Sequence, residues 1–111
     1  MSQAHLIECT TTFGNQEDAL ACAEALVARR LAGCVQVSGP IESIYRWEGN
    51  IQRDSEWKLT IKTISIRQAD LMSAIRSLHS YREPEIIILP IIDASEGYAK
   101  WLIEQTTSSD E

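Results

Sequence analysis

The stretch from Cys34 to Thr63 constrains the fold most, because its pattern is that of two long strands joined by one tight turn. The first arm covers residues 34–47, the turn residues 48–50 and the second arm residues 51–63. Apolar and polar side chains alternate strictly near the end of the second arm: Trp57, Lys58, Leu59, Thr60, Ile61 and Lys62. A period of two over this length predicts a half-buried strand. We therefore expect a long antiparallel hairpin in the middle of the chain.

A strand and a helix are predicted before the hairpin. Residues 5–12 combine apolar and β-branched side chains, which favours a strand. Asn15 can cap the helix that follows, in which apolar residues recur every three or four positions, and Gly33 is a typical stop signal. Within the first arm of the hairpin, Pro40 follows Gly39 and cannot donate a ladder hydrogen bond. We therefore expect a bulge at that point.

A helix, a strand and a short helix are predicted after the hairpin. Ser65 and Gln68 have the spacing of a capping box, which favours the start of a helix. The continuous aliphatic run within residues 85–93 predicts a strand covered on both faces, with Pro90 as a kink or an edge marker. A last short helix follows and ends near residue 106.

The order of these elements predicts the fold class. Strand, helix, strand, strand, helix and strand form a ferredoxin-like βαββαβ sandwich of the α+β class, with an antiparallel sheet, a long hairpin and a short C-terminal helix. We expect one domain over residues 1–111. Helices on one face leave the other face bare. We expect aliphatic and aromatic side chains there, from the long hairpin and from the strand within residues 86–92, and hence partner subunits. Cyclic symmetry would close the open sheet edges, with two or three subunits.

The composition limits the partners and the compartment. Sixteen acidic against ten basic side chains give a net charge of −6, which opposes nucleic-acid binding. No apolar run reaches the roughly 18 residues of a membrane span, and no secretory signal is recognisable, so we expect a cytoplasmic protein. Three cysteines without close spacing predict free thiols and no zinc finger: Cys9, Cys22 and Cys34. No catalytic triad signature, P-loop or dinucleotide motif is present, so we expect no enzyme.

Several short motifs share their order and spacing with one family. They are residues 31–35, 43–49 with 62–63, 79–85 with 89–91, and Tyr98 with Trp101. Through them the chain resembles the CutA family of divalent-cation tolerance proteins over about residues 5–104, and the match is specific because unrelated motifs fall in register. The resemblance implies a ferredoxin-like subunit in a homotrimer whose hairpins reach across to neighbours. It also implies binding of metal ions, copper above all, in some members, and no defining enzymatic activity.

The resemblance makes Cys9 and His79 the candidate metal ligands. Cys9 corresponds to a proposed copper ligand of the family, and a thiolate with an imidazole suits copper or zinc. The alternative for Cys9 is a buried cysteine that acts as a small apolar side chain. The alternative for His79 is a cation or hydrogen-bonded residue at a helix end.

Carboxylates and aromatic side chains are the remaining candidates. Glu56, Glu83 and Glu85 could bind a cation, or could be solvated or paired with nearby lysine and arginine. Tyr81 is a candidate ligand or supporting residue beside them. Large aromatic side chains could line a pocket between subunits, but they more often anchor interfaces: Tyr45, Trp47, Trp57 and Trp101.

Together these observations predict a non-enzymatic, homotrimeric protein that binds copper or another divalent cation and needs no cofactor to fold. Two alternatives stay open. A trimeric small-ligand signalling module would need a cleft lined by more than one chain. A protein-anchoring scaffold, with an unidentified protein partner, would expose an apolar patch outside the trimer contact.

Overall fold

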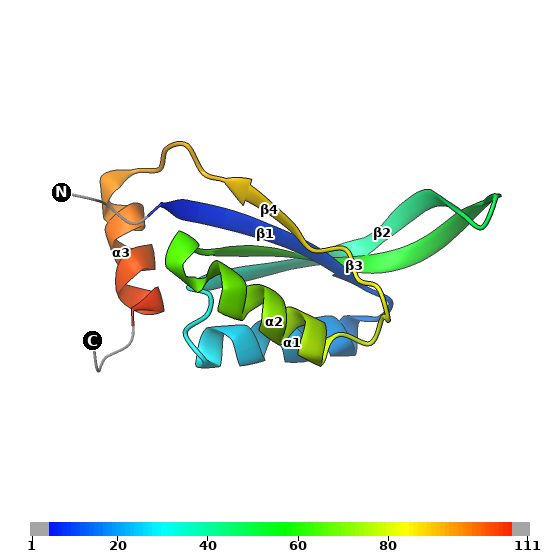
Figure 1. Ribbon diagram of the computed structural model, residues 1–111, viewed down its shortest axis with the longest axis horizontal. Coiled ribbons are helices and arrows are strands. Elements are labelled where there is room, and N and C mark those ends of the chain that lie inside the picture. The colour runs from blue at the N-terminus through cyan, green and yellow to red at the C-terminus, as the bar shows by residue number, and fades with distance from the viewer. Residues whose placement is uncertain (1–4, 108–111) are drawn as a thin grey trace.

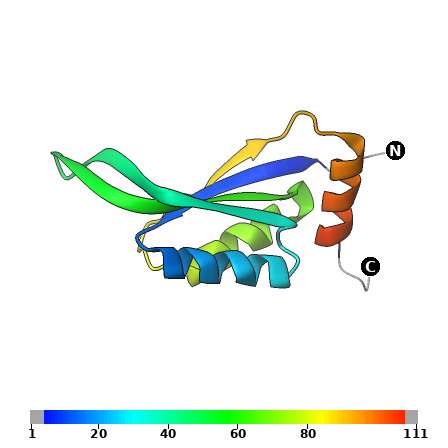
Figure 2. The ribbon, with the colours of Figure 1, turned by 180° about the vertical axis from the view of Figure 1, so that it is seen from behind.

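The computed structural model describes residues 5–107 as an antiparallel sheet with helices packed on one face (Figures 1 and 2). Its elements are β1 (Leu6–Phe13), α1 (Gln16–Ala28), β2 (Cys34–Trp47), β3 (Asn50–Ile64), a 3₁₀ turn (Ser65–Arg67), α2 (Gln68–Leu78), β4 (Ile87–Pro90) and α3 (Glu96–Thr106). The strand order is β2-β3-β1-β4. This order and the two helices on one face confirm the predicted ferredoxin-like fold of the α+β class.

The hairpin of β2 and β3 is longer than the sheet to which it belongs. Its free end projects away from the body, opposite α3, so that the molecule measures 50 × 25 × 21 Å (Figure 1). The turn is shorter than predicted, because Asn50 already pairs with Trp47. Glu48 and Gly49 alone make the turn, with φ of 50° and 81°. Two residues with positive φ form the turn type whose twist matches that of the flanking strands.

The predicted bulge is present in β2. The register shifts by one residue between Ser38 and Ile41, beside Pro40. Trp57 of β3 lies against Gly39, where a Cβ atom would be 2.7 Å from the indole ring. The bulge therefore marks the base of the projecting part of the hairpin, and Trp57 packs over it.

The core lies between the sheet and the helices α1 and α2. Because side chains alternate along β1 and β3, every second residue of these strands faces the helices. The largest side chains that are fully buried there are Phe13, Leu26, Leu59, Ile61, Leu71 and Ile75. The apolar residues of the alternating pattern in β3 therefore point toward the helices.

The start of α1 agrees with the sequence, and its end does not. The Asn15 side chain accepts a hydrogen bond of 2.9 Å from the backbone N–H of Asp18, as a capping residue should. The helix ends at Ala28 rather than near Gly33. Arg30 adopts a φ of 59°. The Leu26 carbonyl accepts hydrogen bonds from the backbone N–H groups of Leu31 and Ala32. A left-handed residue after the last turn is a common way to end a helix, here without glycine.

The predicted capping box does not form. Ser65 opens the 3₁₀ turn instead, and no side-chain hydrogen bond caps α2. The backbone N–H of Ser65 donates to the His5 carbonyl at 2.7 Å. This hydrogen bond ties Ser65 to the sheet, and it therefore does not cap the helix. The helix ends at Leu78, with His79 in an extended conformation.

The prediction of a long, doubly covered last strand is wrong. Only Ile87–Pro90 form β4, which pairs with β1 and lies at the edge of the sheet. Ile87 and Leu89 are 46% and 49% exposed, and Ile92 beyond the strand is 97% exposed. An aliphatic run reports apolar character but not which neighbours cover it. The sequence predicted that Pro90 would either kink the strand or mark an edge, and Pro90 does lie on an edge strand.

The expected exposed apolar residues are present on the hairpin and on β4, but the part of the sheet between them is polar. The register places mainly polar side chains on the face opposite the helices: Glu8, Thr10, Thr12, Gln36, Lys58, Thr60 and Lys62. Lys62 donates to the Gln36 side chain at 3.0 Å. Exposed apolar residues on this face are confined to β4, and larger ones lie at the free end of the hairpin. Within residues 5–107 no helix is both long and apolar enough to span a membrane.

Candidate functional site

Polar and aromatic side chains gather where β1 ends and the hairpin leaves the sheet. We call this group the hairpin-base cluster, and it consists of Thr12, Phe13, Tyr45, Asp54, Glu56, His79 and Tyr81. Three strands, β1, β2 and β3, and the loop after α2 supply its members. The cluster thus depends on the sheet register and on the route of that loop.

Glu56 is the centre of the hairpin-base cluster. It lies on the face of β3 opposite Trp57, and the β1–β3 register, which pairs Thr12 with Lys58, puts Thr12 diagonally beside it. The Oε2 atom of Glu56 accepts the Tyr81 hydroxyl at 2.8 Å and the Thr12 hydroxyl at 3.3 Å. One carboxylate oxygen therefore joins β1, β3 and the loop after α2.

Tyr81 reaches Glu56 by crossing Gly14. A Cβ atom at Gly14 would lie 3.2 Å from the Tyr81 hydroxyl oxygen, so the missing side chain leaves room for the ring. Burial and the hydrogen bond to Glu56 raise the pKa of Tyr81 well above its usual range. Tyr81 therefore keeps its proton and acts as a donor at neutral pH.

His79 packs on the other side of the same strand end. Its ring stacks on Phe13, with the ring centroids 3.9 Å apart and the planes 12° from parallel. Its Nδ1 atom accepts the backbone N–H of Tyr81 at 3.0 Å, which leaves the ring proton of the neutral form on Nε2. Burial lowers the pKa of His79, although the Thr12 backbone and the charges of Asp18 and Glu56 act in the opposite direction. The imidazole is therefore neutral near pH 7.

A second tyrosine–carboxylate pair extends the cluster along the hairpin. The Tyr45 hydroxyl donates to the Asp54 carboxylate. This hydrogen bond raises the pKa of Tyr45. Asp54 and Glu56 are two residues apart on β3 and so share a face. The cluster therefore presents two neighbouring carboxylates, each holding a tyrosine hydroxyl, close to a neutral imidazole.

Cys9, the other predicted metal ligand, lies in the core. Its exposed fraction is 0%, and it faces α1, where Cys22 is its neighbour. Burial, followed by the charge of Cys22, raises the pKa of Cys9 to about 12. A thiol with this pKa stays protonated at pH 7, so a metal ion at Cys9 would have to displace a tightly held proton. Within residues 5–107, no three His, Cys, Asp or Glu side chains gather in a group that could hold a metal ion.

The remaining predicted site residues fall into three situations. Glu83 and Glu85 are exposed in the loop before β4 and form no hydrogen bond or ion pair with the described residues. Tyr45 and Trp47 are 42% and 57% exposed on the projecting hairpin, where an interface could use them. Trp57 is half-buried against the core, so its indole already has partners within the chain.

Trp101 lies on α3, far along the fold from the hairpin-base cluster. It is 40% exposed and tilted against Tyr98, with the ring centroids 5.5 Å apart. The structure thus separates Trp101 from the other predicted interface aromatics.

Sequence reasoning missed the roles of Thr12 and Asp54 and the contact between Tyr81 and Glu56. The alternation along β3 already puts Asp54 and Glu56 on one face. The ferredoxin-like order places β1 beside β3, which is the signal that could have brought Thr12 to them. Tyr81 could not be placed in this way, because the loop after α2 has no periodicity.

Known proteins resemble this chain over most of its length. A profile of the CutA1 divalent ion tolerance protein family matches residues 7–105. The divalent-cation tolerance protein CutA of Thermus thermophilus is 40% identical over 95 residues, which cover 86% of this chain and 92% of that protein. The chloroplastic protein CutA of Arabidopsis thaliana is also 40% identical over 95 residues, which cover 86% of this chain but 52% of that protein. This chain therefore spans about half the length of the plant relative.

The fold gives the same result. The crystal structure of CutA1 from Oryza sativa superimposes with a TM-score of 0.90 at 35% sequence identity, covering 95% of this chain and 96% of that one. The family profile and the superposition thus both cover most of the chain. The chain therefore belongs to the CutA1 family of divalent ion tolerance proteins.

Proposed function

We propose that this chain forms a non-enzymatic homotrimer that binds divalent cations, with copper as the first candidate, at the hairpin-base cluster. The observation that carries the proposal is the pair of neighbouring carboxylates, Asp54 and Glu56, on one face of β3, with the neutral His79 on the other side, at the end of the neighbouring β1. Since no three His, Cys, Asp or Glu side chains within residues 5–107 form a cation-binding group by themselves, the proposal includes ligands from a neighbouring subunit. Carboxylate oxygens and imidazole nitrogen together suit borderline cations such as Cu²⁺ and Zn²⁺. The family is named for tolerance to divalent ions and not for a reaction, which agrees with a binding role.

The hydrogen bonds of the cluster predict weak binding. Glu56 would have to exchange hydroxyl donors for the cation, and Nδ1 of His79 would have to give up the Tyr81 N–H. Each exchange costs a hydrogen bond that already stabilises the folded chain. Weak binding suits a protein that buffers free metal more than one that stores it.

Cys9 has no place in the proposed site. Its thiol is buried in the core and holds its proton, so a cation would have to open the sheet–helix interface to reach it. We therefore assign the cation to the open end of β1 and keep Cys9 as a packing residue.

The trimer part of the proposal rests on the projecting hairpin. Its free end carries apolar side chains that nothing in the described chain covers: Ile44, Trp47 and Ile51 are 62%, 57% and 71% exposed. The edges of β2 and β4 are unpaired within the described sheet. A second and third copy would cover both features. Since the cluster lies at the root of this hairpin, a neighbouring subunit could supply the ligands that one chain lacks.

A calorimetric titration with Cu²⁺ and Zn²⁺ tests the proposal, using the wild type and three variants. Glu56→Gln keeps the size of the side chain and removes its charge. His79→Phe keeps the stack on Phe13 and removes both nitrogens. Cys9→Ala is the matched control in the core. We expect about one ion per subunit in the wild type and in Cys9→Ala, and binding at least about tenfold weaker in the other two variants.

Two results would reject the proposed site. Loss of binding in Cys9→Ala alone would move the cation into the core. Unchanged binding in both Glu56→Gln and His79→Phe would remove the hairpin-base cluster from cation binding. Sedimentation of the same samples would reject the trimer if the mass stayed that of one chain at all concentrations.

A further inference from the structure

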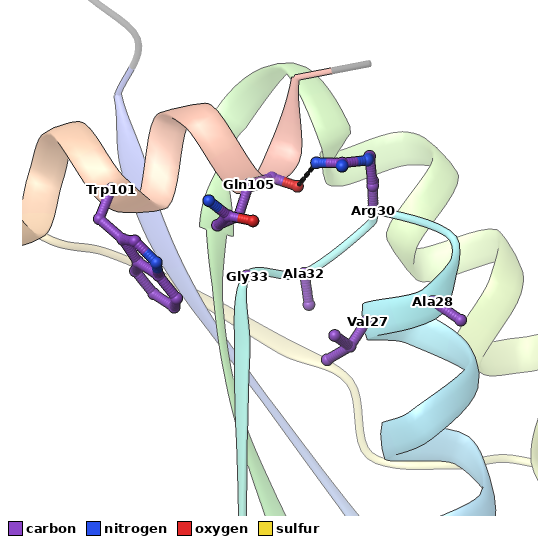
Figure 3. A pocket seen from close by; sticks show the side chains of 7 residues that line it. All are labelled: Val27, Ala28, Arg30, Ala32, Gly33, Trp101 and Gln105. Atoms are coloured by element: carbon purple, nitrogen blue, oxygen red, sulfur yellow. Dashed lines mark hydrogen bonds between the residues drawn. The ribbon is translucent and has the colours of Figure 1, made fainter. Parts of the chain in front are cut away.

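A cavity of about 300 Å³ lies between the end of α1 and the helix α3, at the opposite end of the fold from the hairpin (Figure 3). Its walls are Val27, Ala28, Arg30, Ala32, Gly33, Trp101 and Gln105. None of these residues belongs to the hairpin-base cluster. The volume is at the lower end for small-molecule sites, which suits a ligand about the size of one aromatic ring with a short substituent.

Small residues create the space. Ala32 and Gly33 form the floor where the chain enters β2, and a Cβ atom at Gly33 would lie 2.5 Å from the Leu102 side chain. The floor is therefore already in contact with α3 and cannot carry larger side chains. Val27 and Trp101 supply apolar walls, and they are 44% and 40% exposed. Figure 3 shows them on opposite sides of the Ala32–Gly33 segment.

Arg30 is the cationic group of the cavity. One of its terminal nitrogens donates to the Gln105 carbonyl at 3.1 Å, as Figure 3 shows. A guanidinium has five N–H donors, so this contact fixes its position and leaves donors for a ligand. The backbone of Arg30 has a φ of 59°, which favours glycine, yet an arginine stands there. This backbone conformation places the Arg30 side chain beside the cavity, although glycine would adopt it with less strain.

The electrostatics favour an anion at this end of the cavity. The C-terminal ends of α1 and α3 both lie nearby, and each helix end carries about half a negative charge. Their carbonyl groups are largely occupied, however: Arg30 binds Gln105, and Arg67 donates to the Thr106 carbonyl at 2.6 Å. Arg29 follows the last residue of α1. Arg30 is therefore the positive group that lines the cavity, with guanidinium donors beyond the one bound to Gln105.

We propose that this cavity binds a small monocarboxylate with an apolar, ring-sized body. The carboxylate pairs with the guanidinium of Arg30, whose planar fork matches two carboxylate oxygens. The body packs between Trp101 and Val27, and the Gln105 amide lies at the polar rim. This site goes beyond the proposed cation binding and does not depend on it.

The test uses benzoate as the probe and benzamide as its uncharged counterpart of the same shape. The indole N–H signal of Trp101, assigned with the Trp101→Phe variant, reports binding in a ¹H–¹⁵N NMR titration of the full chain. We expect benzoate to shift this signal with a saturable Kd on the order of 1 mM, as suits a ligand of this size. Benzamide should bind at least about tenfold more weakly, because it lacks the charge that Arg30 recognises.

Two arginine variants make the test specific. Arg30→Gly removes the guanidinium and suits the observed φ, so it should fold and lose at least about tenfold in benzoate affinity. Arg29→Ala removes the neighbouring charge, which does not line the cavity, and should bind benzoate like the wild type. His79→Phe should also bind benzoate normally, which separates this site from the cation site.

The proposal is overturned by any of three results. Benzoate leaves the Trp101 signal unmoved, as it would if a neighbouring subunit filled the cavity. Benzamide binds as well as benzoate, which would make the cavity a purely apolar one. Arg30→Gly binds like the wild type, or Arg29→Ala loses as much, which would make the attraction a general charge effect.

Discussion

At the scale of single residues, the stack of His79 on Phe13 ties stability to pH. In the unfolded chain His79 takes up a proton at about pH 6.5. Burial lowers the pKa in the folded chain, so the folded protein resists this proton. Above pH 6.5 His79 is neutral in both the folded and the unfolded chain, so it does not make stability depend on pH. Below that value the unfolded chain binds the proton more readily, and the free energy of unfolding therefore falls as the pH drops.

The first prediction tests this loss of stability at low pH. In urea unfolding at pH 7.5 and pH 5.5, the wild type should lose more stability between the two values than His79→Phe, which keeps the stack and cannot titrate. Carboxylates away from His79 contribute equally to both proteins, so the difference isolates His79 together with the charges of Asp18 and Glu56 that act on it. Equal losses would mean that the proton finds an acceptor in the folded chain, for which the Thr12 backbone is the nearest candidate.

A second residue-scale prediction compares two glycines in the same part of the fold. Gly33→Ala pushes a methyl group to within 2.5 Å of the buried Leu102 side chain and should destabilise the protein by about 1–3 kcal/mol. Gly97→Ala lies in the first turn of α3 with no atom within 4 Å, and should stabilise by about 0.5–1 kcal/mol through helix propensity. Thermal unfolding of both variants checks the pair. A loss in both would mean that α3 itself tolerates no change.

The residue scale is also where sequence reasoning reached its limit at the candidate site. It named His79, Tyr81 and Glu56 separately, since each has a residue type that suits binding. It could not join Tyr81 to Glu56, because 25 residues and an irregular loop separate them. Burial of Cys9 was one of the two expectations for this residue, and it is confirmed, because Cys9 lies on the helix-covered face of its strand.

At the scale of elements, the hairpin turn is the clearest place to change stability. Gly49 has a φ of 81° with open space around it, so Gly49→Ala should destabilise by about 1 kcal/mol through backbone strain alone. Glu48, with a φ of 50°, should be improved by Glu48→Asn, because asparagine followed by glycine is the preferred pair for this turn. Urea unfolding of both variants measures the effects. A neutral result for Gly49→Ala would mean that the end of the hairpin frays without unfolding the rest.

Elements were predictable where one local signal decided the outcome. Asn15 begins α1 because its side chain satisfies a backbone N–H that nothing else reaches. Ser65 carries an equally good local signal, and the sheet overrides it through the His5 carbonyl. The run around Ile88 predicted a strand, but the length of β4 depends on its place at the edge. Tertiary context, and not propensity, decided the last two.

At the scale of the whole molecule, the exposed apolar end of the hairpin predicts assembly. Trp47→Lys places a charge in the surface that neighbouring copies would bury, and should shift sedimentation toward lighter species by at least about tenfold in the association constant. Leu20→Lys is the matched control, because Leu20 is 42% exposed on α1, away from the hairpin. A larger effect of Leu20→Lys would place the subunit contact on the helical face instead.

The strand order has a consequence for how the chain is made. On the ribosome, β1 emerges first, but its neighbours in the sheet are residues 57–64 and 87–90. The first strand must therefore wait for residues 57–64 before it can pair along one edge and for residues 87–90 before it can pair along the other, whereas the outer part of the hairpin closes from neighbouring residues before either. The apolar surface of Ile44, Trp47 and Ile51 is thus presented before the sheet that anchors it exists. Nascent chains on neighbouring ribosomes of one message would meet first through this surface.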